Sequence, residues 1–193
     1  MTGLLPRSRL RRWIGLIVAL SWAAWGTEAF PQEGVQETRF ASIQYQNPGQ
    51  LEELARKIQP SALTLSLNQI LLGPGKSQTE ARAGRYVDQL FQRVQVILEM
   101  PKPDLRVKIK IYRNQDELSE AFAGITGRST QSPAFYWRET NTIYVHLEKI
   151  STGILAHEMA HAVIGHYFIV SPPEKIAELL CQYVDKEVSR GNF

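Results

Sequence analysis

The chain has 193 residues and a formal net charge of +3, with 22 Lys and Arg against 19 Asp and Glu. The first 29 residues contain four of the arginines and one glutamate, so 18 basic and 18 acidic residues remain beyond them. That balance gives no support for nucleic-acid binding, and the single cysteine, Cys181, excludes an intramolecular disulfide.

Residues 1–29 have the pattern of an export signal. Four arginines precede the uncharged apolar stretch Trp13–Gly26, and residues 27–29 follow as a cleavage site. The apolar stretch is too short to span a bilayer comfortably, which favours a cleaved secretory signal over a transmembrane helix. We therefore expect a periplasmic or secreted protein, with an uncleaved N-terminal membrane anchor as the alternative. Residues 30–193 are long enough for one compact domain with a substantial core.

Periodicity and chain-breaking residues predict a mainly helical first half. Apolar residues recur at helical spacing before Pro60 and again before Pro101, and a Gly-Pro-Gly sequence at 73–75 separates two segments. The predicted elements are an exposed polar leader over 30–38, a strand over 40–45, and helices over 49–58, 61–72 and 79–100.

The second half contains most of the predicted strands. Apolar and cationic residues alternate over 105–111, which is typical of a half-buried strand. The elements that follow are a helix over 115–122, a loop over 124–132, strands over 134–137 and 142–147 joined by a turn at 139–141, a helix from Ser151 or Thr152 to Gly165, and a last helix to Val188 that begins at the capping box Ser171–Glu174. This order predicts an α+β fold with a small antiparallel or mixed sheet.

The most informative motif for function is His157-Glu158-Met159-Ala160-His161. Residues four apart on a helix lie on one face, so the two imidazoles can bind one metal ion. Glu158, next to the first histidine, can then reach a water at that ion. This is the arrangement of a zinc peptidase, in which two ligands and one general base come from a short helix.

A catalytic zinc site needs a third protein ligand and an open position. Sixteen residues separate His161 from Glu178, enough for the motif helix to end and a second helix to return. Glu178 is therefore the expected third ligand. Glu174 is a weaker candidate because it is better placed as the partner in the capping box.

The segments Ile154–Ala162 and Pro172–Tyr183 resemble the gluzincin-type metallopeptidases, and among them the small peptidase-MA-like group. The resemblance implies a zincin-like fold over about residues 105–190, zinc bound by His157, His161 and Glu178, and Glu158 as the base. Some residues depart from the family pattern. Leu179 stands where glycine is usual, Cys181 where alanine is usual, and Gln182 where some members carry an aspartate that orients a histidine. Asp185 is the expected substitute for that aspartate.

Several neighbouring residues have less specific expected roles. Tyr183, Tyr167 and His166 are the candidates to stabilise the oxyanion, and a core or helix-end position is the alternative for His166. His146 is expected to point away from the core on an edge strand, where it faces solvent or lines the cleft. Tyr136 and Trp137 are expected in the core, and Cys181 as a small buried residue.

The leading functional hypothesis is an exported zinc peptidase that acts on peptides or proteins. The alternative is a zinc-binding scaffold or inactive peptidase that acts through a partner protein, because only fifteen residues follow Glu178. A zinc hydrolase for a non-peptide amide is a third hypothesis. A regulatory protein partner fits each of them, and a membrane is expected as a partner only if the N-terminal segment stays uncleaved.

Overall fold

The computed structural model describes residues 34–59 and 78–191. The predicted export signal, the helix over 61–72 and the break at 73–75 lie outside the described residues. Along the chain the elements are β1 (Gly34–Glu37), β2 (Ala41–Tyr45), α1 (Pro48–Lys57), α3 (Gln78–Leu98), β3 (Val107–Tyr112), α4 (Gln115–Thr126), β4 (Ala134–Trp137), the short 3-10 helix η1 (Arg138–Thr140), β5 (Thr142–His146), α5 (Thr152–Tyr167) and α6 (Glu174–Ser189).

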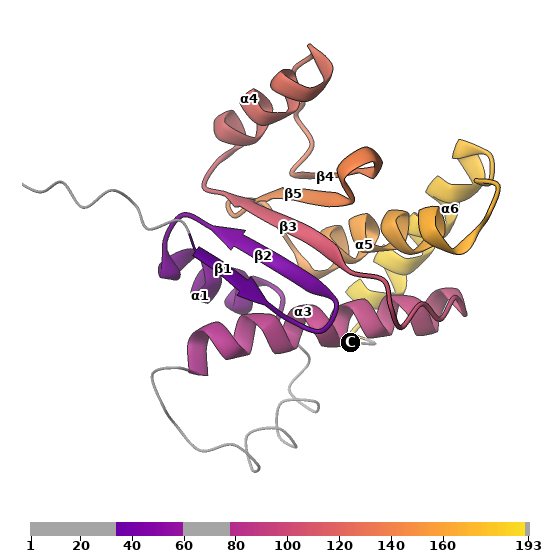
Figure 1. Ribbon diagram of the computed structural model, residues 1–193, viewed down its shortest axis with the longest axis horizontal. Coiled ribbons are helices and arrows are strands. Elements are labelled where there is room, and N and C mark those ends of the chain that lie inside the picture. The colour runs from indigo at the N-terminus through magenta and orange to yellow at the C-terminus, as the bar shows by residue number, and fades with distance from the viewer. Residues whose placement is uncertain (1–33, 60–77, 192–193) are drawn as a thin grey trace, which may run out of the picture. The chain divides into compact units, whose positions relative to one another are not determined.

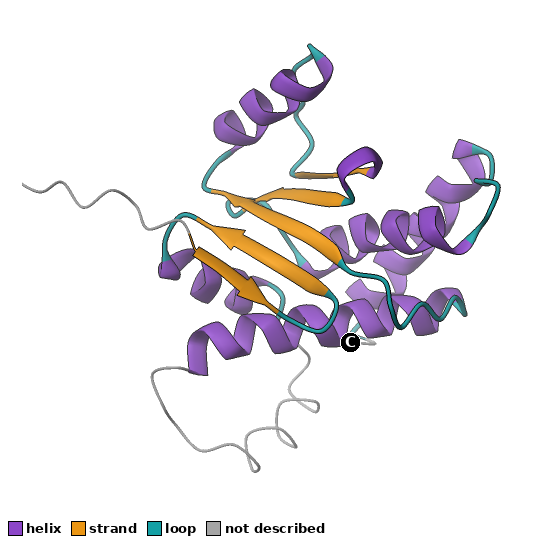
Figure 2. Ribbon diagram, viewed as in Figure 1, coloured by secondary structure: helices purple, strands orange, loops and turns teal. Residues whose placement is uncertain are grey.

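Five strands form one mixed sheet in the order β1-β2-β3-β5-β4. The three inner strands are parallel, and β1 and β4 run antiparallel to their neighbours at the two edges. Helices α1, α3, α5 and α6 lie on one side of this sheet, and α4 contacts β3 and β5 from the other (Figures 1 and 2). The described residues are thus α+β, and among them no helix is long and apolar enough to cross a membrane.

Strand β3 has the alternation that its sequence predicts. Val107, Ile109 and Ile111 are buried in the core, while Lys108 is exposed on the opposite face of the sheet. Strand β1 contradicts the sequence-based prediction that residues 34–37 belong to an exposed leader. These residues pair antiparallel with β2. Their weakly apolar sequence does not predict a strand, because the pairing depends on the free edge of β2.

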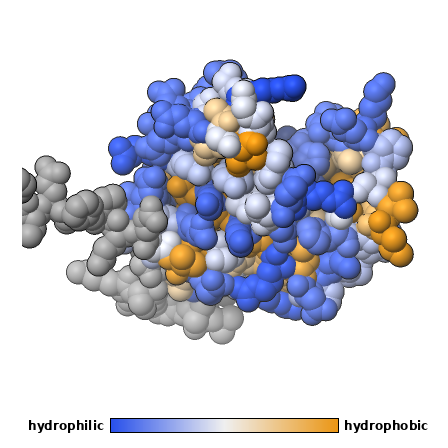
Figure 3. All heavy atoms as spheres, turned by 45° about the horizontal axis from the view of Figure 1, so that its top comes forward, coloured by the Kyte–Doolittle hydropathy of each residue, from blue (hydrophilic) through white to orange (hydrophobic). Residues whose placement is uncertain are grey.

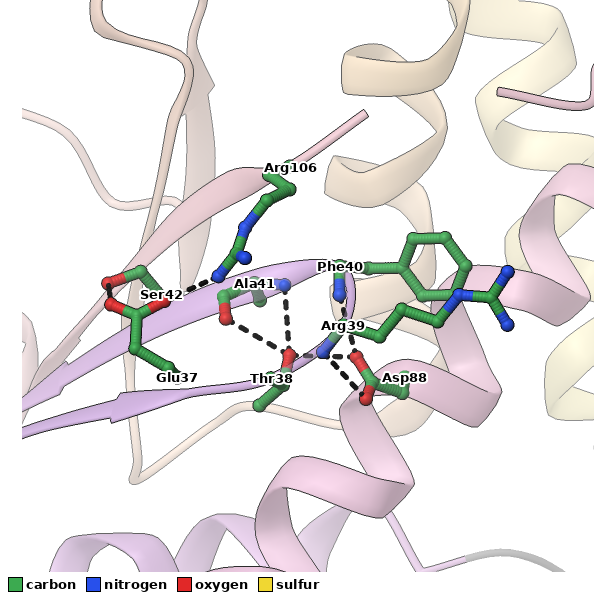
Figure 4. Close-up of polar contacts among 8 residues, drawn as sticks. All are labelled: Glu37, Thr38, Arg39, Phe40, Ala41, Ser42, Asp88 and Arg106. Carbon is green, nitrogen blue, oxygen red and sulfur yellow. Dashed lines mark hydrogen bonds and ion pairs between the residues drawn. The ribbon is translucent and has the colours of Figure 1, made fainter. Parts of the chain in front are cut away.

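A carboxylate of α3 fixes the turn between β1 and β2 (Figure 4). Asp88 accepts hydrogen bonds from the Thr38 hydroxyl at 2.7 Å and from the backbone N–H groups of Arg39 and Phe40 at 3.0 and 2.9 Å. Because one side chain satisfies three donors, the edge hairpin is held firmly on the longest helix. The edge itself carries an ion pair between Glu37 and Arg106.

Helix α5 lies at the centre of the fold, between the sheet, α3 and α6. Its residues are buried on most sides, which accounts for a sequence that is apolar almost all round. The Ser151 hydroxyl caps its first turn by accepting a hydrogen bond from the N–H of Ile154 at 3.2 Å, as the sequence predicts.

The end of α4 and the start of α6 differ from prediction. Helix α4 continues to Thr126, beyond the predicted end at Phe122, and Gly127 ends it in the left-handed conformation with φ 71°. Helix α6 begins at Glu174 with Pro173 as N-cap, so the predicted capping box does not form. The reason is that Ser171 lies too far ahead of the first turn, and its hydroxyl is held by Arg138 instead.

His146 points away from Ile143 as expected, but its predicted place on an exposed edge strand is wrong. Strand β5 lies inside the sheet between β3 and β4, and α4 covers the face to which Tyr144 and His146 both point. His146 is therefore fully buried, and neither ring nitrogen has a hydrogen-bond partner among the described residues. Glu148 lies 4.0 Å from its Nδ1. Burial lowers the pKa of His146, Lys149 and Lys57 lower it further, and Glu148 opposes the shift.

Because the folded protein resists protonation of His146, stability should fall as the pH drops below the unfolded value of about 6.5. His146→Leu should flatten this dependence, which for one group is at most about 1.4 kcal/mol per pH unit. Urea unfolding at pH 7.5 and 5.5, with chelator present, measures the effect. His166→Leu removes an exposed histidine and serves as the matched control. Equal pH slopes for His146→Leu and the unaltered protein would contradict the prediction.

Candidate metal centre

Helix α5 brings the two motif histidines together as its periodicity predicts. His157 and His161 lie one turn apart, and their Nε2 atoms are 3.2 Å from each other. The rings meet at 71°, so they converge on one point from different directions. Two ring nitrogens at this separation can bind the same ion.

Helix α6 places Glu178 opposite the two histidines. One carboxylate oxygen, Oε2, lies 3.7 Å from His157 Nε2 and 3.5 Å from His161 Nε2. The other oxygen, Oε1, accepts a hydrogen bond from Gln182 Nε2 at 2.9 Å. Because Gln182 holds one oxygen, it turns the other toward the histidines.

The three atoms fit a tetrahedral zinc ion. With Zn–N and Zn–O bonds of about 2.0 to 2.2 Å, neighbouring ligands of a tetrahedron lie about 3.3 to 3.5 Å apart. The observed separations of 3.2, 3.5 and 3.7 Å are close to those values. Two imidazoles and one carboxylate are also the ligand types of several catalytic zinc sites. These three residues therefore fit the ion without rearrangement of the backbone.

The three metal-binding candidates are open to solvent on one side, whereas the neighbouring acid is not. The side chains of His157, His161 and Glu178 are 19%, 29% and 43% exposed, but Glu158 as a residue is only 8% exposed. Large hydrophobic residues are exposed at the end of α5, in the α5–α6 connection and on α6, and Figure 3 shows an orange patch at the right edge of the molecule. These exposed residues are Tyr167, Phe168, Ile169, Val170, Ile176, Leu179 and Tyr183.

Burial dominates the electrostatics of Glu158. Burial, together with a smaller effect of the nearby Glu178 charge, raises the pKa of this carboxyl to about 7. A hydrogen bond from the backbone N–H of Tyr136 acts in the opposite direction. Near neutral pH the group can therefore both accept and return a proton.

The second histidine is kept neutral. Burial lowers the pKa of His161, and the neighbouring His157 lowers it further, while Glu178 has the opposite effect. A neutral imidazole is the form that binds a metal ion, so the environment of His161 favours a ligand over a cation.

Cys181 also lies at this centre, although the sequence predicts only a small buried residue. It is buried as expected, but its Sγ and ring nitrogens of His157 and His161 all lie within 4.8 Å of one another. Burial raises the pKa of the thiol, and the charges of Glu178 and Glu158 add to that effect. Its spacing of three residues from Glu178 could have revealed it, because that spacing puts both side chains on one helix face.

Asp185 does not take the role predicted for it. Its Oδ1 accepts a hydrogen bond from Ser189 at 3.0 Å, and a Cβ added at Gly153 would lie 2.0 Å from that oxygen. Asp185 thus packs on the first turn of α5, one turn before His157. Gln182 supplies the outer contact of the centre, through Glu178 rather than through a histidine.

The oxyanion candidates are on the surface. His166 lies in the last turn of α5, where its Nδ1 donates to the carbonyl of Ala162 at 3.0 Å, and it lines a separate pocket near Pro101 and Asn141. His166 thus has the helix-end position that was its predicted alternative to an oxyanion role. Tyr167 and Tyr183 are exposed.

Strand β4 is the sheet edge next to the centre, a position predicted for the strand with His146. Its Tyr136 is half-buried, donates its hydroxyl to Asn141 Oδ1 at 2.9 Å, and gives its backbone N–H to Glu158. Burial raises the pKa of Tyr136 to about 12, with Arg138 lowering it and Glu139 raising it. The edge strand and the buried acid are therefore in direct contact.

Comparison with protein-family models, curated proteins and solved structures gave no significant match. The likeness of the two segments to gluzincins therefore stays a prediction.

Proposed function

We propose that this protein is an exported, zinc-dependent peptidase of gluzincin type. The observation that carries the proposal is the set of three ligand atoms at 3.2, 3.5 and 3.7 Å, with the carboxyl of Glu158 on the same helix turn as His157. Each group has the chemical type that metal-assisted hydrolysis requires. The centre also has an exposed side by which substrate can enter.

His157, His161 and Glu178 would hold the ion, and Glu158 is the general base. A bound zinc ion supplies polarisation of the scissile carbonyl and a lower pKa for the attacking water. Glu158 takes one proton from that water as the new C–O bond forms, and it delivers the proton to the amine nitrogen as the C–N bond breaks. Its burial shields this proton from bulk solvent between the two transfers.

The substrate proposed is an extended peptide lying along β4. This strand is an edge of the described sheet, and such an edge offers backbone N–H and C=O groups that can pair with another strand. The Tyr136 N–H contacts Glu158, so a peptide on this edge would lie next to the base. Leu179, which is exposed on α6 directly after Glu178, favours substrates with apolar side chains.

A peptide-library assay on the zinc-loaded protein tests the proposal. We expect cleavage products that disappear with chelator and return when zinc is restored, with metal content measured in parallel. Bound zinc without cleavage of any peptide would overturn the peptidase and favour the zinc-binding scaffold. Hydrolysis of small amides but not of peptides would instead favour the non-peptide hydrolase.

A further inference from the structure

The thiol of Cys181 lies beside the metal centre in a position that the peptidase mechanism does not use. Cys181 is completely buried on α6, one helical turn after Glu178, and its Sγ is within 4.8 Å of ring nitrogens of both histidines. It is the only cysteine in the chain. The two imidazoles therefore have two further candidate ligands on α6, the partly exposed carboxylate of Glu178 and the buried thiol of Cys181.

We propose that the centre has a second set of ligands, His157, His161 and Cys181, which binds thiophilic cations such as Cd²⁺ or Cu⁺. This second set uses the same two histidines as the zinc site of the proposed function, but metal binding by it does not require catalysis. Hard or borderline ions prefer an oxygen ligand and would bind Glu178 as the third ligand. Soft ions prefer a sulfur ligand and would bind the Cys181 thiolate. The same protein would then hold different metals with different third ligands.

The geometry allows both sets but with different adjustments. The Glu178 set already has separations close to those of a tetrahedron. For the Cys181 set, a tetrahedral zinc ion would bring sulfur and nitrogen to about 3.6 Å, and a larger ion would leave them farther apart. The separations, none above 4.8 Å, therefore need to shorten by at most about 1.2 Å, which a rotation about the Cα–Cβ bond of Cys181 can supply.

The binding step is chemically balanced. The thiol loses its proton to solvent as the metal–sulfur bond forms, and no electron is transferred. An ion held by the buried thiolate lies on the inner side of the two histidines, and Glu178 is released from it. Soft ions should accordingly occupy the centre without supporting hydrolysis.

Titration of the full-length, metal-free protein with Cd²⁺ tests the inference. We expect a thiolate-to-cadmium charge-transfer absorption in the near ultraviolet that saturates at one ion per chain. Since the chain has one cysteine, this absorption can arise only from Cys181. Cys181→Ser and Cys181→Ala should abolish it and weaken Cd²⁺ binding at least about tenfold. Circular dichroism of both variants checks that the fold is retained.

Two further variants separate this inference from the proposed function. Glu178→Gln should keep the cadmium–thiolate absorption, whereas His161→Gln should lose it at the same concentrations. Absence of the absorption in the unaltered protein would overturn the inference, even if zinc-dependent cleavage is found. Absorption that is unchanged in His161→Gln would also overturn it, because the cysteine would then bind without the histidines. A normal absorption in a protein that cleaves no peptide would support this inference and reject only the peptidase.

Discussion

Glu158→Gln should leave zinc bound and lower kcat for peptide hydrolysis by on the order of 10²- to 10⁴-fold, the usual contribution of a general base. Glutamine has nearly the same shape, and its carbonyl oxygen can still accept the hydrogen bond from the Tyr136 N–H. It cannot take the proton from water. The substituted side chain is uncharged, and because burial disfavours the glutamate charge, we expect no loss of stability. Metal content, thermal unfolding and kcat on one library-derived peptide measure the three parts of the prediction.

Glu174→Gln is the matched control. Glu174 is an exposed carboxylate in the first turn of α6, so the same chemical change there should leave both zinc content and kcat unaltered. Turnover by Glu158→Gln at the rate of the unaltered protein would show that another group accepts the proton. Loss of zinc from Glu158→Gln would show that this residue is a ligand and not a base.

The parts of the fold that could be predicted depend on local interactions. The alternation of β3, the Ser151 cap and the spacing of His157 and His161 each follow from a few neighbouring residues and one period. Strand β1 and the burial of His146 could not be predicted in this way. Both depend on which strand lies beside which, because β1 uses the free edge of β2, and α4 covers the face of β5 that carries His146.

The same distinction holds within the metal centre. The position of Glu178 could be predicted because the chain length between two helices limits which residues can return to the histidines, and Glu178 does lie 3.7 and 3.5 Å from them. The outer contacts could not, because they depend on how α6 is rotated against α5. That rotation turns Gln182 toward Glu178, Asp185 toward Gly153, and Cys181 toward the two imidazoles.

Glu178→Ala should lower zinc affinity by more than about 100-fold, because loss of a ligand exceeds the 10- to 100-fold loss typical of an outer contact. Alanine removes the oxygen that lies 3.5 Å from His161 and leaves only two nitrogens at this side of the centre. Cleavage should fall in proportion to zinc occupancy. Competition of the purified protein with a chromophoric chelator gives the affinity, and helix α6 should remain folded because Glu178 is partly exposed.

A graded series makes this prediction specific. Gln182→Leu removes the hydrogen bond to Glu178 Oε1 but leaves the ligand, so zinc affinity should fall by about 10- to 100-fold. Glu174→Ala, in the same helix, should leave zinc affinity unchanged. The series therefore compares a proposed ligand, a residue hydrogen-bonded to that ligand, and a carboxylate on the same helix with neither role. Full zinc affinity in Glu178→Ala would place the third ligand elsewhere, and equal losses in all three variants would indicate a damaged helix instead of a lost ligand.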